Sequence, residues 1–232
     1  MAHSLHHHGN DKTSATAVAV VIAPIDPSAG PRPVITWEHA STGLLQKCMP
    51  SLWSDPAFGI PAIDRIAGAN WVIVAMDYSF AEKGGPLPYL IGEGEARAAL
   101  DSVRAARQMP ELKLDTRTVV WGHSQGGHAA LWTGIVGPRY APDVKIVGVA
   151  WHLADGPADR LDGGAFRERA AGERLCPPVL LTREQGPRMG TANGHEQKSH
   201  AKAQSRLPPS LKLWTTSRPI SPFSFVGQGR KG

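Results

Sequence analysis

Short apolar runs rich in β-branched residues recur along the first two thirds of the 232-residue chain, and polar or turn-forming residues separate them. Runs of this length and composition are typical of strands buried in a sheet. The predicted strands cover residues 18–22, 34–37, 71–76, 118–121 and 144–150. We expect each of them to be a buried strand.

A helical pattern lies between the third and fourth of these runs. From residue 94 to residue 109, small and apolar side chains recur every three or four positions, which places them on one face of a helix. These side chains are Ala96, Ala99, Leu100, Val103 and Ala106. Pro110 marks the end of the helix, because proline does not continue one. Strands that alternate with helices predict an α/β fold with a mostly parallel sheet and crossover helices.

The pattern weakens beyond about residue 162, where the chain becomes rich in Arg, Gly and Pro. Residues 186–204 and 217–232 show neither a helical nor a strand period, and only residues 178–182 still resemble a strand. We therefore expect a flexible N-terminal segment at 1–16 and an α/β core at 17–162. The basic, Gly/Pro-rich region at 163–232 is expected to be atypical or truncated and partly disordered. A reading-frame change in a GC-rich gene is one hypothesis for such a tail.

Charge and cysteine content narrow the possible partners. Residues 1–150 contain 12 Lys and Arg against 13 Asp and Glu, so the net charge of +5 comes from the remaining 82 residues. A nearly neutral body without a basic, aromatic-lined stripe argues against nucleic-acid binding. The longest apolar run, at 17–23, is too short to span a membrane, and no signal-peptide pattern is visible. Cys48 and Cys176 allow one long-range disulfide and no disulfide framework.

The candidate chemistry is concentrated in the segment Gly122-His123-Ser124-Gln125-Gly126. It matches the G-x-S-x-G pattern of a nucleophile elbow, and it lies between a predicted strand and the start of a helix, as that motif requires. The elbow raises the serine hydroxyl above the sheet on a strained backbone, so its two flanking positions need glycine. The backbone amide of Gln125 would then face the developing oxyanion. The structural alternative is an N-cap serine at a glycine-rich helix entry.

Several further stretches, together with this motif, resemble the secretory lipase, or lipase A-like, family of the α/β-hydrolase superfamily. The resemblance extends over about residues 33–161. It is carried by Trp37-Glu38-His39-Ala40-Ser41-Thr42-Gly43, Cys48-Met49-Pro50-Ser51-Leu52, Met76-Asp77-Tyr78, Pro88-Tyr89-Leu90-Ile91-Gly92, residues 100–107 and residues 121–134. It implies an α/β-hydrolase fold and hydrolysis of carboxylic esters, typically acylglycerols or short-chain esters. It also suggests a secreted protein.

The resemblance also implies a second oxyanion donor at Ser41, in the loop after the strand that ends at Trp37. This chain has Ala40 where the family usually has glycine. We interpret His39 as a loop histidine that satisfies backbone groups, and Asp77 as structural because it precedes Ser124 in the chain.

A serine nucleophile needs a histidine base that is oriented by a carboxylate. In α/β-hydrolases both follow the serine in the chain, and Glu184 with His195 fits that order. His200 and His152 are the next candidates for the base. We do not assign this role to His123 or His128, because an elbow directs neighbouring side chains away from the nucleophile.

The sequence therefore predicts a serine carboxylic-ester hydrolase that acts through an acyl-enzyme on Ser124, without metal or cofactor. Its expected partner is a small-molecule ester or acylglycerol. Two alternatives stay open: an acyltransferase or perhydrolase on the same fold, and a catalytically impaired α/β-hydrolase-like protein.

Overall fold

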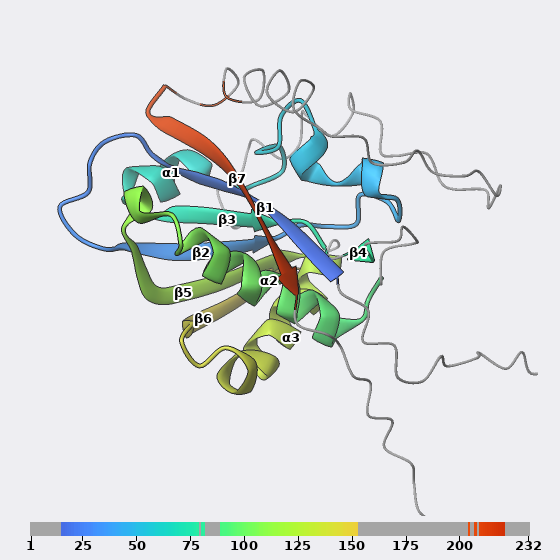
Figure 1. Cartoon of the computed structure of the whole chain (residues 1–232). Coiled ribbons are helices and arrows are strands. Elements are labelled where there is room, and N and C mark those ends of the chain that lie inside the picture. Colours follow the sequence, from blue (N-terminus) through green and yellow to red (C-terminus); the bar gives the residue numbers. More distant parts are fainter. Residues whose placement is uncertain are drawn as a thin grey trace, which may run out of the picture.

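The computed structural model describes residues 15–78, 80–81, 89–152, 204, 207 and 209–220. Three helices and seven strands form most of this part of the chain (Figure 1). The strands are β1 (Ala15–Pro24), β2 (Arg32–Glu38), β3 (Val72–Met76), β4 (Phe80–Ala81), β5 (Leu114–His123), β6 (Lys145–His152) and β7 (Leu211–Ile220). The helices are α1 (Ile63–Gly68), α2 (Gly92–Ala106) and α3 (Gln125–Tyr140), with short 3-10 turns at Gln46–Cys48, Pro50–Leu52 and Pro110–Leu112.

The strands form one mixed sheet. At its centre β3, β2, β5 and β6 run parallel in that order, whereas β1 runs antiparallel to β3. A mostly parallel sheet was expected, but β1 runs antiparallel to the central strands. Two consecutive strands can run parallel only if the chain between them returns to the other end of the sheet, which takes a dozen or more residues. Only residues 25–31 connect β1 to β2, so β1 runs in the opposite direction. The predicted α/β fold, with parallel strands joined through helices, is confirmed.

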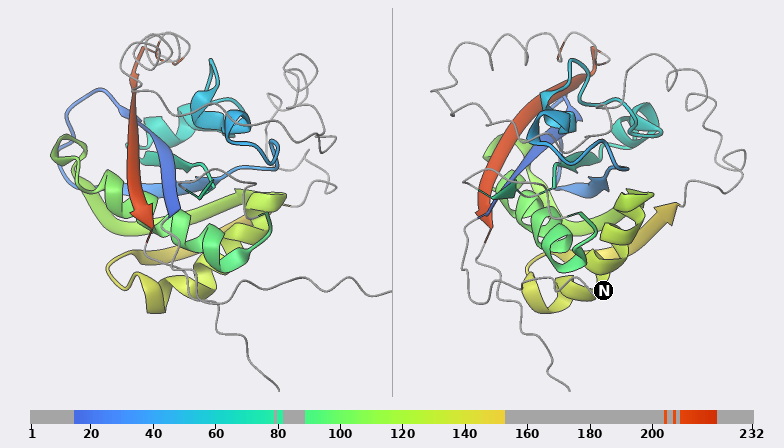
Figure 2. Two further views of the ribbon diagram at one scale, coloured as in Figure 1. Left: turned by 45° about the vertical axis from the view of Figure 1, so that its right-hand side comes forward. Right: turned by 90° about the vertical axis from the view of Figure 1, so that its right-hand side faces the viewer.

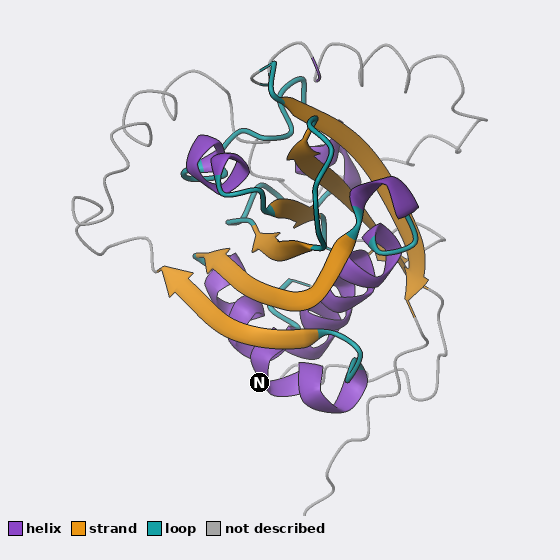
Figure 3. Ribbon diagram, turned by 90° about the vertical axis from the view of Figure 1, so that its left-hand side faces the viewer, coloured by secondary structure: helices purple, strands orange, loops and turns teal. Residues whose placement is uncertain are grey.

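Helices cover both faces of this sheet. α2 and α3 pack side by side on one face, where a core of small residues from α2 meets valines and alanines of β1, β2 and β3 (Figure 2). The other face packs against α1 through a smaller cluster that includes Trp37, Ile63 and Ile66. Figure 3 shows how the twisted sheet curves around α2 and α3.

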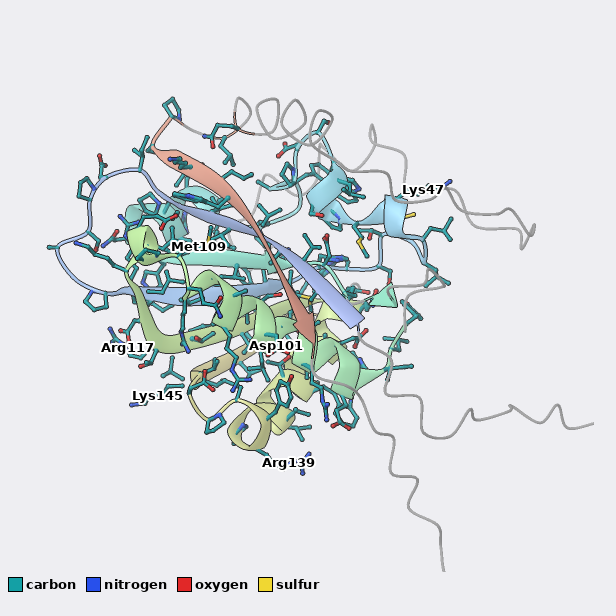
Figure 4. All side chains as sticks on the ribbon, viewed as in Figure 1. Lys47, Asp101, Met109, Arg117, Arg139 and Lys145 are labelled. Atoms are coloured by element: carbon teal, nitrogen blue, oxygen red, sulfur yellow. The ribbon has the colours of Figure 1, made fainter. Side chains whose placement is uncertain are left out.

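Polar contacts join α2 to the C-terminal end of α3. The Tyr140 hydroxyl donates a hydrogen bond of 2.7 Å to the buried Asp101 of α2. Arg104, one turn further along α2, forms an ion pair with Asp143. Figure 4 labels Asp101 on α2, and it shows Arg139 and Lys145 pointing outward from the molecule.

Two strands extend beyond the predicted core at residues 17–162. β1 begins at Ala15, and β7 lies in the region from residue 163 to 232. β7 pairs antiparallel with β1 over all ten residues, from Ala15 opposite Ile220 to Pro24 opposite Leu211. The strand includes residues 217–220, for which we expected no strand period. Long-range pairing with β1 forms it there without a strong local pattern.

β6 also differs from the prediction, because it is not a buried strand. Val147, Val149 and Trp151 are 49%, 38% and 51% exposed. Among the described strands β6 lies at the edge of the sheet, so it has a neighbour only on the side of β5. The remaining predicted strands and the predicted helix are present: β1, β2 and β5 are longer than predicted, β3 begins one residue later, and α2 ends at Ala106, before residue 109. The possible strand at 178–182 lies outside the described residues.

The carboxyl ends of the four parallel strands meet at one edge of the sheet. Glu38 is aligned with Met76 on one side and with Gly122 on the other, and His123 is aligned with His152. In open α/β sheets, ligands bind outside the carboxyl ends of the strands. No helix among the described residues is both long enough and apolar enough to cross a bilayer.

Candidate active site

The predicted strand, turn and helix around Ser124 are present. β5 ends at His123, Ser124 has φ 55° and ψ −113°, and α3 begins at Gln125. A positive φ at a residue other than glycine is strained, and such strain persists only where the surroundings enforce it. Here the amide of Ser124 donates a 2.8 Å hydrogen bond to the carbonyl of His152, which ties the turn to the end of β6. We call residues 122–126 the Ser124 turn.

Two glycines allow the Ser124 turn to fit against its neighbours. A Cβ atom on Gly122 would lie 1.9 Å from the carbonyl oxygen of Gly126. A Cβ atom on Gly126 would lie 1.7 Å from the carbonyl oxygen of Glu38 at the end of β2. Both obstacles are backbone atoms that cannot rotate away. The positions for which the sequence pattern requires glycine are therefore the positions where the structure has no room for a side chain.

Ser124 occupies the N-cap position of α3, but its side chain makes no capping hydrogen bond. The structural alternative, a serine that caps the helix, is therefore not what the structure shows. The first amides of a helix have no partner within the helix, and that of Gln125 immediately follows the serine. Helix N-termini also carry a partial positive charge, which stabilises an anion close by. The start of α3 therefore has the features of an anion-stabilising site next to a serine hydroxyl.

A buried carboxylate from α2 holds the Gln125 side chain. Glu95 is 1% exposed, and its Oε1 accepts hydrogen bonds from Gln125 Nε2 at 2.9 Å and from the Leu90 amide at 3.2 Å. Its Oε2 lies 2.8 Å from Nδ1 of His128, one turn into α3. Glu95 thus fixes the first turn of α3 to α2 and to the chain that enters α2. His128 therefore belongs to the same contact as Gln125.

The loop after β2 contains Ser41, the second predicted oxyanion residue. The Ser41 hydroxyl lies 3.0 Å from the hydroxyl of Tyr89, in the segment before α2. Nδ1 of His39 donates a 2.6 Å hydrogen bond to the Ala40 carbonyl, and burial lowers the pKa of His39 to about 4. The Tyr78 hydroxyl donates to the His39 carbonyl at 2.6 Å. A neutral His39 that satisfies a backbone group agrees with the interpretation from sequence.

Asp77 follows β3 at the same edge of the sheet. Its Oδ1 accepts a 3.2 Å hydrogen bond from the amide of Ser51, while Oδ2 is buried without a partner. Burial raises the pKa of Asp77 from 3.8 to about 7, against the smaller opposite effect of the Ser51 hydrogen bonds. The contact anchors the loop after β2 to the end of β3, which is the structural role expected from sequence.

The remaining predicted catalytic residues, Glu184 and His195, lie outside the described residues, as does the alternative base His200. His152 is described: its ring stacks on that of His123 with centroids 5.3 Å apart. Burial, followed by the neighbouring His152, lowers the pKa of His123. Within the described ranges, no cluster of three or more histidine, cysteine or acidic side chains could hold a metal ion. Cys176 also falls outside them, so its pairing with Cys48 stays a prediction.

Sequence reasoning missed two buried carboxyl groups beside the Ser124 turn, those of Glu95 and Glu38. Both are at most 1% exposed. The sequence contained a signal of burial for each of them. Glu95 directly precedes the apolar face of the predicted helix, and Glu38 is the acidic residue that ends an apolar strand run.

Comparison with known proteins finds a family match over part of the chain. Residues 62–158 match the model of the secretory lipase family. Lipase 1 of Candida albicans is 26% identical over 160 residues, which cover 61% of this chain and 32% of the lipase. A Mycobacterium tuberculosis protein described as a probable inactive lipase is 27% identical over 153 residues, which cover 61% of this chain and 33% of that protein.

Among solved structures, the rice cell wall degrading esterase from Xanthomonas oryzae is 29% identical, with a TM-score of 0.46. The match covers 57% of this chain and 36% of the esterase. The chain spans about a third of the length of the relatives it matches. The resemblance predicted from the sequence is confirmed: residues 62–158 of this chain match the secretory lipase family.

Proposed function

We propose that this chain is a serine carboxylic-ester hydrolase of the esterase or lipase type, with the Ser124 turn as its nucleophile elbow. The observation that carries the proposal is the backbone of Ser124, held at φ 55° between β5 and α3 by two glycines that have no room for a side chain. The relationship to secretory lipases supports the same assignment.

In the proposed reaction, Ser124 Oγ attacks the carbonyl carbon of an ester while a base removes the hydroxyl proton. The tetrahedral oxyanion is stabilised by the Gln125 amide and by a second donor at Ser41. An oxyanion-hole donor of this kind contributes about 3 kcal/mol to catalysis. The intermediate releases the alcohol, which takes up the proton, and leaves an acyl group on Ser124. Water then attacks the acyl-enzyme, which releases the acid and restores the serine.

We assign the base to His195 and its orienting carboxylate to Glu184, with His200 and His152 as alternatives for the base. The substrate is a small-molecule ester or an acylglycerol, as for the relative from Malassezia furfur named a secreted triacylglycerol lipase. The proposal includes no metal, no nucleic acid and no stable membrane insertion. Nucleophilic acyl transfer needs no metal ion, so EDTA should leave activity unchanged.

The second candidate is a catalytically impaired relative. A specific observation favours it, because one relative of similar coverage is described as a probable inactive lipase. Such a protein would keep the Ser124 turn but would lack a histidine within hydrogen-bond reach of Ser124 Oγ. Acyl transfer or perhydrolysis would differ only in the molecule that attacks the acyl-enzyme.

Hydrolysis of p-nitrophenyl esters of increasing acyl length separates these functions. The hydrolase account predicts turnover by the purified chain, none above background by Ser124→Ala, and a preferred acyl length that separates esterase from lipase. His195→Ala should reduce turnover nearly as much as Ser124→Ala, because triad residues act as a unit. Equal rates for the wild type and Ser124→Ala would contradict the proposal, whereas a neutral His195→Ala would move the base to another histidine.

A further inference from the structure

Glu38 occupies an unusual place at the end of β2, under the Ser124 turn. Its carbonyl oxygen touches Gly126, while its side chain reaches Thr133, two turns into α3. Glu38 is 0% exposed. One residue therefore supports α3 at its first residues through the backbone and at its middle through a carboxyl group.

The hydrogen-bond donors around this carboxyl group decide its protonation state. Thr133 Oγ1 lies 3.0 Å from Glu38 Oε1 and 2.9 Å from the carbonyl oxygen of Ala129. A hydroxyl has one proton, and the Ala129 carbonyl can only accept. Threonine in a helix commonly donates to the carbonyl four residues earlier. If Thr133 donates to Ala129, the proton between Thr133 and Glu38 must belong to Glu38.

The charged groups near Glu38 favour the same state. No described side chain forms an ion pair with it, and Oε2 has no hydrogen-bond partner. Burial raises the pKa of Glu38 well above its ordinary value, the Thr133 hydrogen bond lowers it by less, and the charge of Glu95 on α2 raises it further. His39, the first residue after β2, is kept neutral by burial, which lowers its pKa. Among the described residues, Tyr78, which follows β3, also interacts electrostatically with Glu38.

We infer that Glu38 is a neutral carboxylic acid that donates a hydrogen bond to Thr133 and so positions α3 against the end of β2. Glu38 is thus a positioning residue. The protonation state rests on the hydrogen-bond geometry and the burial of Glu38, whereas its effect on catalysis rests on the proposed function.

Infrared difference spectra of the wild type and Glu38→Gln test the protonation state without any activity. The wild-type spectrum at neutral pH should contain the carbonyl stretch of a protonated carboxylic acid that Glu38→Gln lacks. Thr133→Val should shift this band, because it removes the hydrogen-bond acceptor. A difference spectrum with only carboxylate bands would overturn the inference.

Unfolding in urea gives a second test with a defined slope. A buried acid that stays protonated while its unfolded form ionises loses stability as pH rises through the range above its ordinary pKa. The unfolding equilibrium constant of the wild type, relative to Glu38→Gln, should therefore rise about tenfold per pH unit between pH 5.5 and 7.5. The exposed Glu111→Gln is the matched control and should leave the slope unchanged. A ratio independent of pH would contradict a neutral Glu38.

The catalytic part is tested by the rate at which an organophosphonate labels Ser124. Glu38→Gln keeps a neutral donor and should retain wild-type labelling, whereas Glu38→Ala should label more slowly although Ser124 is intact. If neither the wild type nor the variants label, the proposed function fails while the infrared result still decides the state of Glu38. If Glu38→Ala labels like the wild type, Glu38 does not position the site.

Discussion

At the scale of single residues, the Ser124 turn depends on the absence of side chains at two points. Gly126→Ala would place its Cβ 1.7 Å from the backbone of Glu38, so β2 or α3 must move. We expect it to lower the free energy of unfolding by about 3 kcal/mol, at the upper end of overpacking effects. Gly148→Ala is the control, because its Cβ would meet no atom within 4 Å. Thermal unfolding of both variants checks this, and equal losses would contradict the tight fit.

Asp77 should make stability depend on pH. Its pKa is about 7 in the folded chain and 3.8 as a free group, so the folded state keeps the Asp77 proton to a higher pH than the unfolded state does. The contribution of this proton to the free energy of unfolding is complete below about pH 4 and is lost as pH rises to about 7. Asp77→Asn still accepts the Ser51 hydrogen bond, and its unfolding free energy should depend less on pH in that range.

Urea unfolding at pH 5 and pH 8 measures the difference. Asp115→Asn is a suitable control, because the Arg117 side chain lowers the pKa of Asp115 to about 2, outside this interval. A wild type and an Asp77→Asn variant with parallel pH profiles would show that Asp77 is ionised in the folded chain.

At the scale of elements, β7 contributes two leucines to the core. Leu211 and Leu213 are 1% and 3% exposed and pack with Val20 and Ile22 of β1, whereas Lys212 between them is exposed. Leu213→Ala should cost about 2–5 kcal/mol, the usual range for a buried leucine. Lys212→Ala should change stability by less than about 0.5 kcal/mol. Urea denaturation gives both values, and a neutral Leu213→Ala would mean that β7 is not part of the folded core.

The elements that could be predicted from sequence are those whose pattern is local. The strand before Ser124, the helix of α2 and the glycines of the turn all follow from residues close together in the chain. β7 could not be predicted, because its partner β1 lies about 200 residues away and Lys212, Ser217 and Arg218 weaken its apolar pattern. Glu95 and Glu38 were missed for a similar reason. Their partners Gln125, His128 and Thr133 reach them only through packing of α2, α3 and β2.

At the scale of the whole molecule, the fold collects the candidate site at one edge of the sheet. The carboxyl ends of β2, β3, β5 and β6 supply the Ser41 loop, Asp77, Ser124 and the exit of the chain after His152. The described residues thus contain the candidate nucleophile and both candidate oxyanion donors. The base and its carboxylate stay predictions at His195 and Glu184, outside the described residues, because their assignment depends on chain order alone.

Intact-mass analysis after treatment with an organophosphonate shows whether Ser124 is a nucleophile. We expect a single addition to the wild type, located at Ser124 by peptide mapping, and no addition to Ser124→Ala. An unchanged wild-type mass, or an addition that persists in Ser124→Ala, would contradict that role.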